Sequence, residues 1–203
     1  MASIPESVPP VAGIILAAGQ GSRMGGDKVL LAWGGQPLIR HIAGVALASR
    51  LETIYVIVGH QADAVADALD GMPVRIIPNH SYAQGQSTSL TAGVAALPEQ
   101  TAAALIMLAD QPLLTACVID QLITTFHQTG APIVAACSGK RRGNPVLFTR
   151  TLFPELLAIR GDLGARNVVA AHREELRCVE VASHVLADID TPEAYRALLG
   201  TIS

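Results

Sequence analysis

Short apolar runs alternate along the chain with segments whose apolar residues recur at helical spacing. The runs that predict buried strands are residues 11–17, 54–58, 74–77, 103–109, 132–137 and 176–182. The segments that predict helices are residues 37–49, 62–69, 87–97, 115–130, 151–157, 163–171 and 192–199. Pro37 stands at a first helical position, and Thr115 and Gly130 are suited to begin and end the helix between them.

This order of strand and helix predicts βαβ crossovers and therefore an α/β fold with a mainly parallel sheet and helices on both faces. The irregular stretch at 138–150, with a short extended piece at 143–148, predicts an antiparallel excursion. Without an internal repeat or a linker, residues 11–203 are expected to form a single domain, preceded by a flexible tail at 1–10. In such sheets ligands bind where the strands end, so the residues after each strand are the candidates for function.

Composition narrows the class of protein further. Half of the 203 residues are apolar and 15% are charged, which excludes a disordered chain. The longest uninterrupted apolar run, 102–109, is far shorter than the roughly 20 residues that a membrane-spanning helix needs. The start of the chain carries Glu6 and three prolines but no basic segment, so no signal peptide is expected. The net charge of −3 and the absence of a long basic stripe argue against nucleic acid as a partner.

The three cysteines, Cys117, Cys137 and Cys178, are odd in number and far apart. They predict reduced thiols in the core of a cytoplasmic protein, and neither a disulfide nor a metal site.

A glycine-rich loop follows the first predicted strand, with four glycines among residues 19–26. Such a loop can surround an anion with backbone N–H groups, and Arg23 and Lys28 add positive charge, so it predicts a phosphate-binding site. A Walker A loop beginning at Gly21 would require lysine at position 27, where aspartate stands. A dinucleotide fingerprint beginning at Gly19 would require glycine or alanine at position 24, where methionine stands. The alternative is that this loop is a purely structural turn that binds no ligand.

Two acidic segments follow predicted strands. Asp110 comes at the tip of the run 103–109, and Asp188 and Asp190 flank one apolar residue in an extended stretch. One or two carboxylates of this kind can hold Mg²⁺, which prefers oxygen ligands. The alternative is capping: Asp110 precedes one helix, and either Asp190 or Thr191 could cap the last one.

Two polar loops supply further candidates. The segment 85–90 places three hydroxyl residues at a helix start, where they either cap the helix or contact a base or ribose. The basic segment 140–146 is either a solvated loop or part of an acceptor site.

The first loop, Leu16-Ala17-Ala18-Gly19-x-Gly21-x-Arg23-Met24-Gly25-x-x-Lys28, resembles the signature of nucleotidyltransferases of the sugar-nucleotide and molybdenum-cofactor type. Segments 85–90, 108–112, 161–166 and 188–193 are similar to further motifs of this group, and the resemblance extends from Val11 to Leu199. The nearest family is molybdenum cofactor cytidylyltransferase, one of the MobA-like NTP transferases. It implies a Rossmann-like nucleotidyltransferase fold.

The resemblance also implies roles for individual residues. It implies that Arg23, Lys28 and Asp110 are catalytic and that Asp110 and Asp190 hold Mg²⁺. The implied nucleotide-binding residues are Leu16, Ala17, Ala18, Gly19, Gly21, Arg23, Lys28, Gly85, Ser89 and Asp110. The implied acceptor-binding residues are Arg142, Asn144 and Arg166, although the family usually has histidine where Asn144 stands. Ala18 replaces the glycine usual in guanylyltransferases, and its methyl group favours the smaller pyrimidine.

The implied reaction transfers CMP from CTP to the terminal phosphate of molybdenum-molybdopterin and releases pyrophosphate. The product would be the cytosine dinucleotide cofactor, with hand-over to a hydroxylase of the xanthine dehydrogenase type as a further expectation. GTP as donor, another phosphorylated acceptor such as a sugar phosphate, and a role in cofactor delivery without catalysis remain the alternatives.

Overall fold

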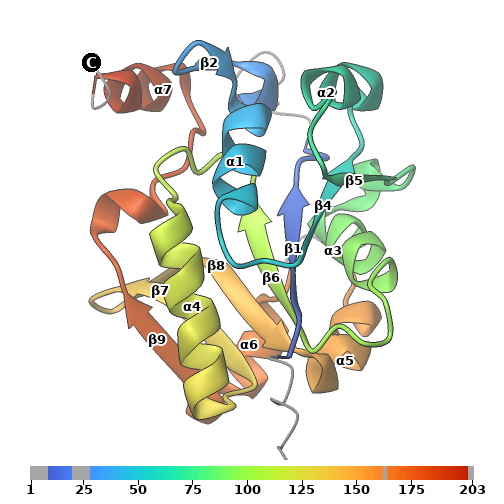
Figure 1. Ribbon diagram of the computed structural model, residues 1–203, viewed down its shortest axis with the longest axis vertical. Coiled ribbons are helices and arrows are strands. Elements are labelled where there is room, and N and C mark those ends of the chain that lie inside the picture. The colour runs from blue at the N-terminus through green and yellow to red at the C-terminus, as the bar shows by residue number, and fades with distance from the viewer. Residues whose placement is uncertain (1–8, 20–27, 162–163, 201–203) are drawn as a thin grey trace, which may run out of the picture.

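A seven-stranded sheet forms the centre of the chain (Figure 1). The computed structural model describes residues 9–19, 28–161 and 164–200. In chain order, the strands of this sheet are β1 (Val11–Leu16), β4 (Thr53–Val58), β5 (Arg75–Pro78), β6 (Ala103–Leu108), β7 (Ile133–Ser138), β8 (Arg141–Thr149) and β9 (Leu176–Glu180). Across the sheet they lie in the order β5-β4-β1-β6-β8-β7-β9. Strand β1 is paired on both sides by parallel strands, and the burial of its first five residues agrees with this place inside the sheet.

Strand β8 runs antiparallel to both of its neighbours, whereas the other pairings in the sheet are parallel. The predicted antiparallel excursion is therefore confirmed, although β8 is longer than the extended piece expected at 143–148. The reversal brings the first residues of β8 to the edge where the parallel strands end.

Helices cover both faces of the sheet and close two apolar cores (Figure 1). In chain order the helices are α1 (Leu38–Leu47), α2 (Ala62–Ala68), α3 (Gln86–Ala95), α4 (Ala116–Thr129), α5 (Phe153–Ala158), α6 (Arg166–Ala171) and α7 (Pro192–Leu199). Helices α1, α2 and α4 bury their apolar sides in one core, and α3, α5 and α6 bury theirs in the other. The α/β class with helices on both faces is thus confirmed.

Local chemistry explains where the longest helix begins and ends. The Thr115 hydroxyl accepts a hydrogen bond from the Val118 N–H, at 3.4 Å, and Gly130 ends α4 in a left-handed conformation. A small hairpin of β2 (Ala32–Trp33) and β3 (Gln36–Pro37) was not predicted. Its signal is the Gly-Gly pair at 34–35, since both residues have positive φ, as a tight hairpin turn requires.

The prediction of three reduced core thiols is wrong. Cys137 in β7 and Cys178 in β9 form a disulfide, and Cys178 and the free Cys117 are exposed. The two strands are parallel neighbours, so the two Cα atoms lie 5.6 Å apart, within the range that a disulfide spans. The sequence separation of 41 between these cysteines concealed this proximity. Within the described residues, no helix is long and apolar enough to cross a membrane.

Candidate active site

The segment that follows β1 is held at the carboxyl edge of the sheet by its neighbours on both sides. The Ala17 N–H donates to the Ile57 carbonyl at 2.9 Å, and the Ala109 N–H donates to the Leu16 carbonyl at 3.3 Å. Three strand ends are thereby joined at one place. Their side chains face a common cavity because parallel strands end on the same edge.

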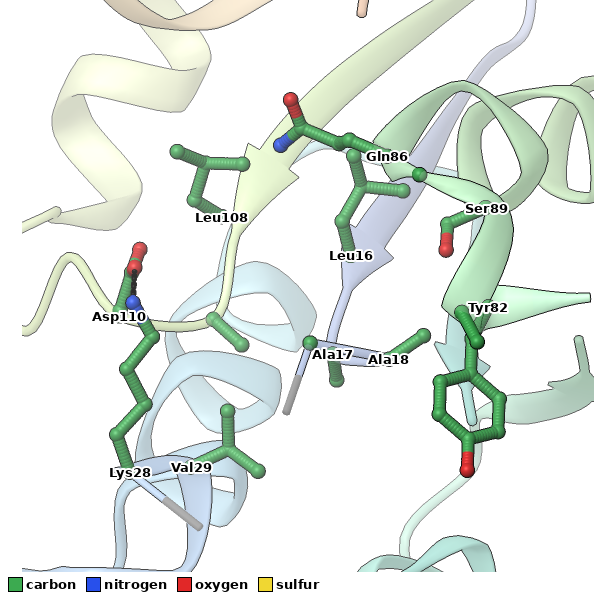
Figure 2. A pocket seen from close by; sticks show the side chains of 14 residues that line it. Leu16, Ala17, Ala18, Lys28, Val29, Tyr82, Gln86, Ser89, Leu108 and Asp110 are labelled. Atoms are coloured by element: carbon green, nitrogen blue, oxygen red, sulfur yellow. Dashed lines mark hydrogen bonds and ion pairs between the residues drawn. The ribbon is translucent and has the colours of Figure 1, made fainter. Parts of the chain in front are cut away.

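This cavity, here named cavity A, has a volume of about 320 Å³ (Figure 2). Eight of the predicted nucleotide-binding residues line it: Leu16, Ala17, Ala18, Gly19, Lys28, Gly85, Ser89 and Asp110. The other two, Gly21 and Arg23, lie outside the described residues. In Figure 2, Lys28 and Asp110 lie on one side of the Leu16–Ala18 segment, and Tyr82 and Ser89 lie on the other.

The Ala18 methyl group occupies a crowded corner of cavity A. Ala18 is buried, and a Cβ added at Gly59 would lie 2.8 Å from the Ala18 Cβ and 2.7 Å from the Tyr82 Cβ. Glycine at position 59 is therefore what allows the Ala18 and Tyr82 side chains to approach each other. Sequence reasoning missed Tyr82, which lies on the 3₁₀ turn Tyr82–Gln84 rather than next to a strand.

Ser89 belongs to a buried hydrogen-bond network. The Asn79 side-chain amide donates to the Ser89 and Thr88 hydroxyls, at 2.9 Å in each case, and the Asn79 oxygen accepts from the Ser81 N–H at 3.0 Å. The capping alternative is not observed, because Gly85 stands at the N-cap of α3 and makes no side-chain cap. Asn79 was also missed, although its place directly after β5 was the available signal.

Lys28 joins the two predicted metal-binding acids. It lies on a 3₁₀ turn, Lys28–Leu30, and its Nζ donates to Asp110 Oδ2 and, at 3.0 Å, to Asp190 Oδ1. Burial alone would lower the pKa of the Lys28 ammonium, but the charge and hydrogen bond of Asp110, with a smaller contribution from Asp190, raise it overall. The lysine therefore stays charged and shares its single positive charge between the two carboxylates in this structure.

Neither acid serves as a helix cap. Thr115 caps α4, and the Thr191 hydroxyl caps α7 by accepting from the Ala194 N–H at 3.2 Å. A backbone hydrogen bond of 2.9 Å from the Ile189 N–H to the Asp110 carbonyl holds the two acidic segments together. Neither carboxylate is thus used in capping, and Lys28 is the group that both of them bind in this structure.

The residues at this point fit a magnesium ion. Asp110 Oδ1 is buried and has no hydrogen-bond partner among the described residues, and Asp190 contributes a second, more exposed carboxylate. No group of three or more His, Cys, Asp or Glu residues suited to a metal occurs within the described part of the chain. Two carboxylates nevertheless suffice where substrate phosphates and water complete the shell, as is usual for Mg²⁺.

A second cavity, here named cavity B, has a volume of about 350 Å³ and shares Gln86 and Leu108 with cavity A. All three predicted acceptor-binding residues, Arg142, Asn144 and Arg166, line it. Burial, followed by the charge of Arg166, lowers the pKa of the Arg142 guanidinium. Two guanidinium groups that repel each other at a cavity provide a favourable site for an anion.

Cavity B also contains acceptor groups that were not assigned from the sequence. Gln111 and Asp188 line it together with Arg141. The Arg141 guanidinium donates to the Leu186 carbonyl at 3.1 Å, which ties β8 to the segment that leads to Asp188. The sequence pattern indicates Asp188 only as a neighbour of Asp190, and Gln111 only as a part of the segment 108–112.

Comparison with known families agrees with this geometry. The family model described as "MobA-like NTP transferase domain" matches residues 13–176, which include every residue that lines the two cavities except Leu186 and Asp188. The chain belongs to this family. The family assignment suggested by the glycine-rich loop is therefore confirmed, as is the Rossmann-like nucleotidyltransferase fold.

Curated members of the family carry different names. Nicotine blue oxidoreductase of Paenarthrobacter nicotinovorans is 34% identical over 201 residues, covering 95% of this chain and 98% of that protein. Purine catabolism protein PucB of Bacillus subtilis (strain 168) is 30% identical, covering 92% and 95%. A probable molybdenum cofactor guanylyltransferase of Mycobacterium avium (strain 104) is 30% identical, covering 93% and 94%.

Solved structures show the same architecture. Rv0371c of Mycobacterium tuberculosis H37Rv superposes with a TM-score of 0.86 at 26% identity, covering 96% of this chain and all of that one. A complex of Rv0371c with manganese gives a TM-score of 0.82 at 25% identity, covering 95% and 99%. A divalent metal is thus established for a related protein of this fold.

Proposed function

We propose that this nucleotidyltransferase transfers CMP from CTP to the terminal phosphate of molybdenum-molybdopterin, with Mg²⁺ as cofactor. The observation that carries the proposal is that cavity A, which Asp110 and Lys28 line, adjoins cavity B through the shared residues Gln86 and Leu108. A nucleotide in cavity A and an anionic acceptor in cavity B would meet next to the carboxylates and Lys28. We place the reaction in the cytoplasm, where nucleoside triphosphates are available.

The chain's own residues act by positioning and by charge. The acceptor phosphate oxygen attacks the α-phosphorus of CTP in line, the bond to the β-phosphate breaks, and pyrophosphate leaves. Lys28 and the loop N–H groups after β1 hold the triphosphate. Asp110 and Asp190 would hold Mg²⁺, which when bound neutralises charge on the phosphate oxygens. The reaction needs no covalent enzyme intermediate.

The preference for CTP rests on the crowding around Ala18. Ala18 and Tyr82 line cavity A and pack closely around Gly59, so the Ala18 methyl group is held in place at the cavity wall, and a pyrimidine needs less room than a purine. The relative named as a guanylyltransferase makes GTP the alternative donor.

The relative named as an oxidoreductase raises a second class of function. The arginines of cavity B favour an anionic acceptor, and the Lys28–Asp110–Asp190 cluster favours a metal-bound phosphate, so we prefer nucleotidyl transfer. The proposal includes hand-over of the product to a molybdenum hydroxylase. The alternative is a protein that delivers the cofactor without catalysing its synthesis.

The test is pyrophosphate release with Mg²⁺ and molybdenum-loaded molybdopterin, comparing CTP, GTP, ATP and UTP. We expect release with CTP and a cytosine dinucleotide product. In the variant Ala18→Gly, we expect the ratio of kcat/KM for CTP to that for GTP to fall by about tenfold or more, since one methyl group in an apolar pocket is worth roughly 1–3 kcal/mol. If the unaltered protein prefers GTP, the proposed donor is wrong and the protein is a guanylyltransferase. Folded protein that binds CTP and releases no pyrophosphate would contradict the proposal.

A further inference from the structure

Gln111 lines cavity B and has a buried side-chain oxygen without a hydrogen-bond partner among the described residues. Its side chain is 2% exposed, its Nε2 donates to Asp188 Oδ1 at 2.7 Å, and its Oε1 has no partner among the described residues. A carboxylate only accepts hydrogen bonds, so the Gln111 NH₂ group must face Asp188 and the orientation of the amide is fixed. A buried oxygen without a donor costs free energy, which a ligand donor would recover.

Asp188 places a carboxylate beside this oxygen. Burial, followed by the nearby charge of Asp110, raises the pKa of the Asp188 carboxyl, while the hydrogen bond from Gln111 and the charge of Arg141 oppose that rise. Because Gln111 occupies one Asp188 oxygen, the other oxygen is the one left for a ligand. Gln111 and Asp188, joined by this hydrogen bond, thus both line cavity B.

The rest of cavity B has the opposite character. Arg142, Arg166 and Asn144 offer donors, and the wall between the polar groups is apolar, with Val146 and Phe148 contributing. A ligand that satisfies all of these groups has an anionic end, an apolar body, and two adjacent hydrogen-bond donors.

We propose that the Gln111 Oε1 and the free oxygen of Asp188 form an acceptor pair that selects an acceptor substrate carrying two adjacent donors. This inference rests on the proposed function, in which the pair would receive the 2-amino group and neighbouring ring N–H of the pterin. Vicinal hydroxyl groups of a sugar phosphate share this donor chemistry, so the experiment has to separate the two sources.

The experiment compares two fluorescent probes by titration in the presence of CTP and Mg²⁺. Pterin-6-carboxylate carries an anionic group and the amino and ring N–H donors, whereas lumazine-6-carboxylate replaces the amino group with an oxygen. We expect the unaltered protein to bind the pterin at least about tenfold more tightly, the lower range for a hydrogen bond to a charged group.

The decisive variant is Asp188→Asn. Its amide oxygen can still accept from Gln111, while its NH₂ group replaces the acceptor offered to the ligand. We expect the preference for the pterin to fall below about threefold, with unchanged CTP affinity as evidence that the nucleotide side and the fold are intact. Asp67→Asn, an exposed aspartate on α2, is the matched control and should keep the preference.

The outcomes separate this inference from the proposed function. Equal preference in the unaltered protein and Asp188→Asn overturns the acceptor pair even if molybdopterin is turned over. Failure of the unaltered protein to prefer the pterin overturns it as well when Asp188→Asn leaves the binding of glucose 1-phosphate unchanged. If glucose 1-phosphate binds in place of the pterin and Asp188→Asn weakens it by about tenfold, the acceptor pair stands and the molybdopterin proposal falls.

Discussion

Lys28 is the residue whose removal tests the arrangement of charges most directly. In Lys28→Met, the ammonium that Asp110 and Asp190 share is lost, while a side chain of similar length remains. The two carboxylates then lack their cation. We expect turnover to be abolished, because Lys28 is proposed to hold the triphosphate.

The structure sets the expected size of the stability change. The Lys28 and Asp110 side chains are 18% and 13% exposed, whereas Asp190 is 53% exposed and largely compensated by water. Removing one partner of a buried pair costs about 3–5 kcal/mol, and we take about 3 kcal/mol because this pair is only partly buried. For a chain of this size, that corresponds to a decrease in Tm of about 6–12 °C.

Metal binding should change in the opposite direction. In the unaltered protein, a divalent cation has to displace Lys28 from both carboxylates, but in Lys28→Met they are free. Opposite unit charges 4 Å apart near a protein surface interact by roughly 4 kcal/mol, and about 1.4 kcal/mol already corresponds to tenfold in affinity. We therefore expect Mn²⁺ to bind the variant at least about tenfold more tightly in the absence of nucleotide.

The assay is calorimetric titration of Mn²⁺ together with thermal unfolding with and without the metal. Lys140→Met provides the control, because Lys140 is exposed and lies in the turn between β7 and β8. Unchanged or weaker Mn²⁺ affinity in a folded Lys28→Met protein would refute the idea that Lys28 holds the place of the metal.

Three further changes probe other parts of the molecule. Cys178→Ser should destabilise the oxidised protein by up to about 4 kcal/mol, because the disulfide closes a loop with a sequence separation of 41. Cys117→Ser should have no effect on stability, because Cys117 is free. An equal Tm for the two variants would contradict this expectation. Hydrogen bonds to Glu175 and Glu155 raise the pKa of His172 in the folded protein. The stabilisation that protonated His172 gives is therefore present below pH 6.5 and is lost as the pH rises through the folded-state pKa. Denaturant unfolding should show that His172→Gln lowers the free energy of unfolding more at pH 5.5 than at pH 9. Gly59→Ala should cost about 1–3 kcal/mol by overpacking and weaken CTP binding, and unchanged unfolding and affinity would exclude the crowding described there.

Periodicity predicted the fold well because each strand and helix carries its own pattern. The buried runs around Ile14 and Leu105 and the amphipathic segment that forms α4 show their periods without any knowledge of the tertiary structure. The β2–β3 hairpin could not be predicted because its strands are too short to show a period. The disulfide could not be predicted because the pairing of β7 with β9 depends on the order of the strands in the sheet.

In the candidate site too, some features could be predicted from local sequence and others could not. Residues directly after a strand, such as Ala18 and Asp110, could be named because parallel strands end at one edge. Their roles stay predictions, as do those of Gly21 and Arg23, which lie outside the described residues. Lys28 pairs with both acids, and Gln111 donates a hydrogen bond to Asp188. Each of these interactions joins residues more than 70 positions apart, so no local sequence pattern predicts them.

The reversed direction of β8 has a consequence for how such proteins can diversify. Cavity A is built by residues that follow their strands, but Arg142 and Asn144 reach cavity B from the beginning of β8, next to the short turn after β7. Insertions or substitutions in that turn can reshape cavity B while β1, β6 and their loops stay intact. One form of cavity A can therefore be combined with many forms of cavity B, and this modularity offers a physical basis for the different names that relatives of similar length carry.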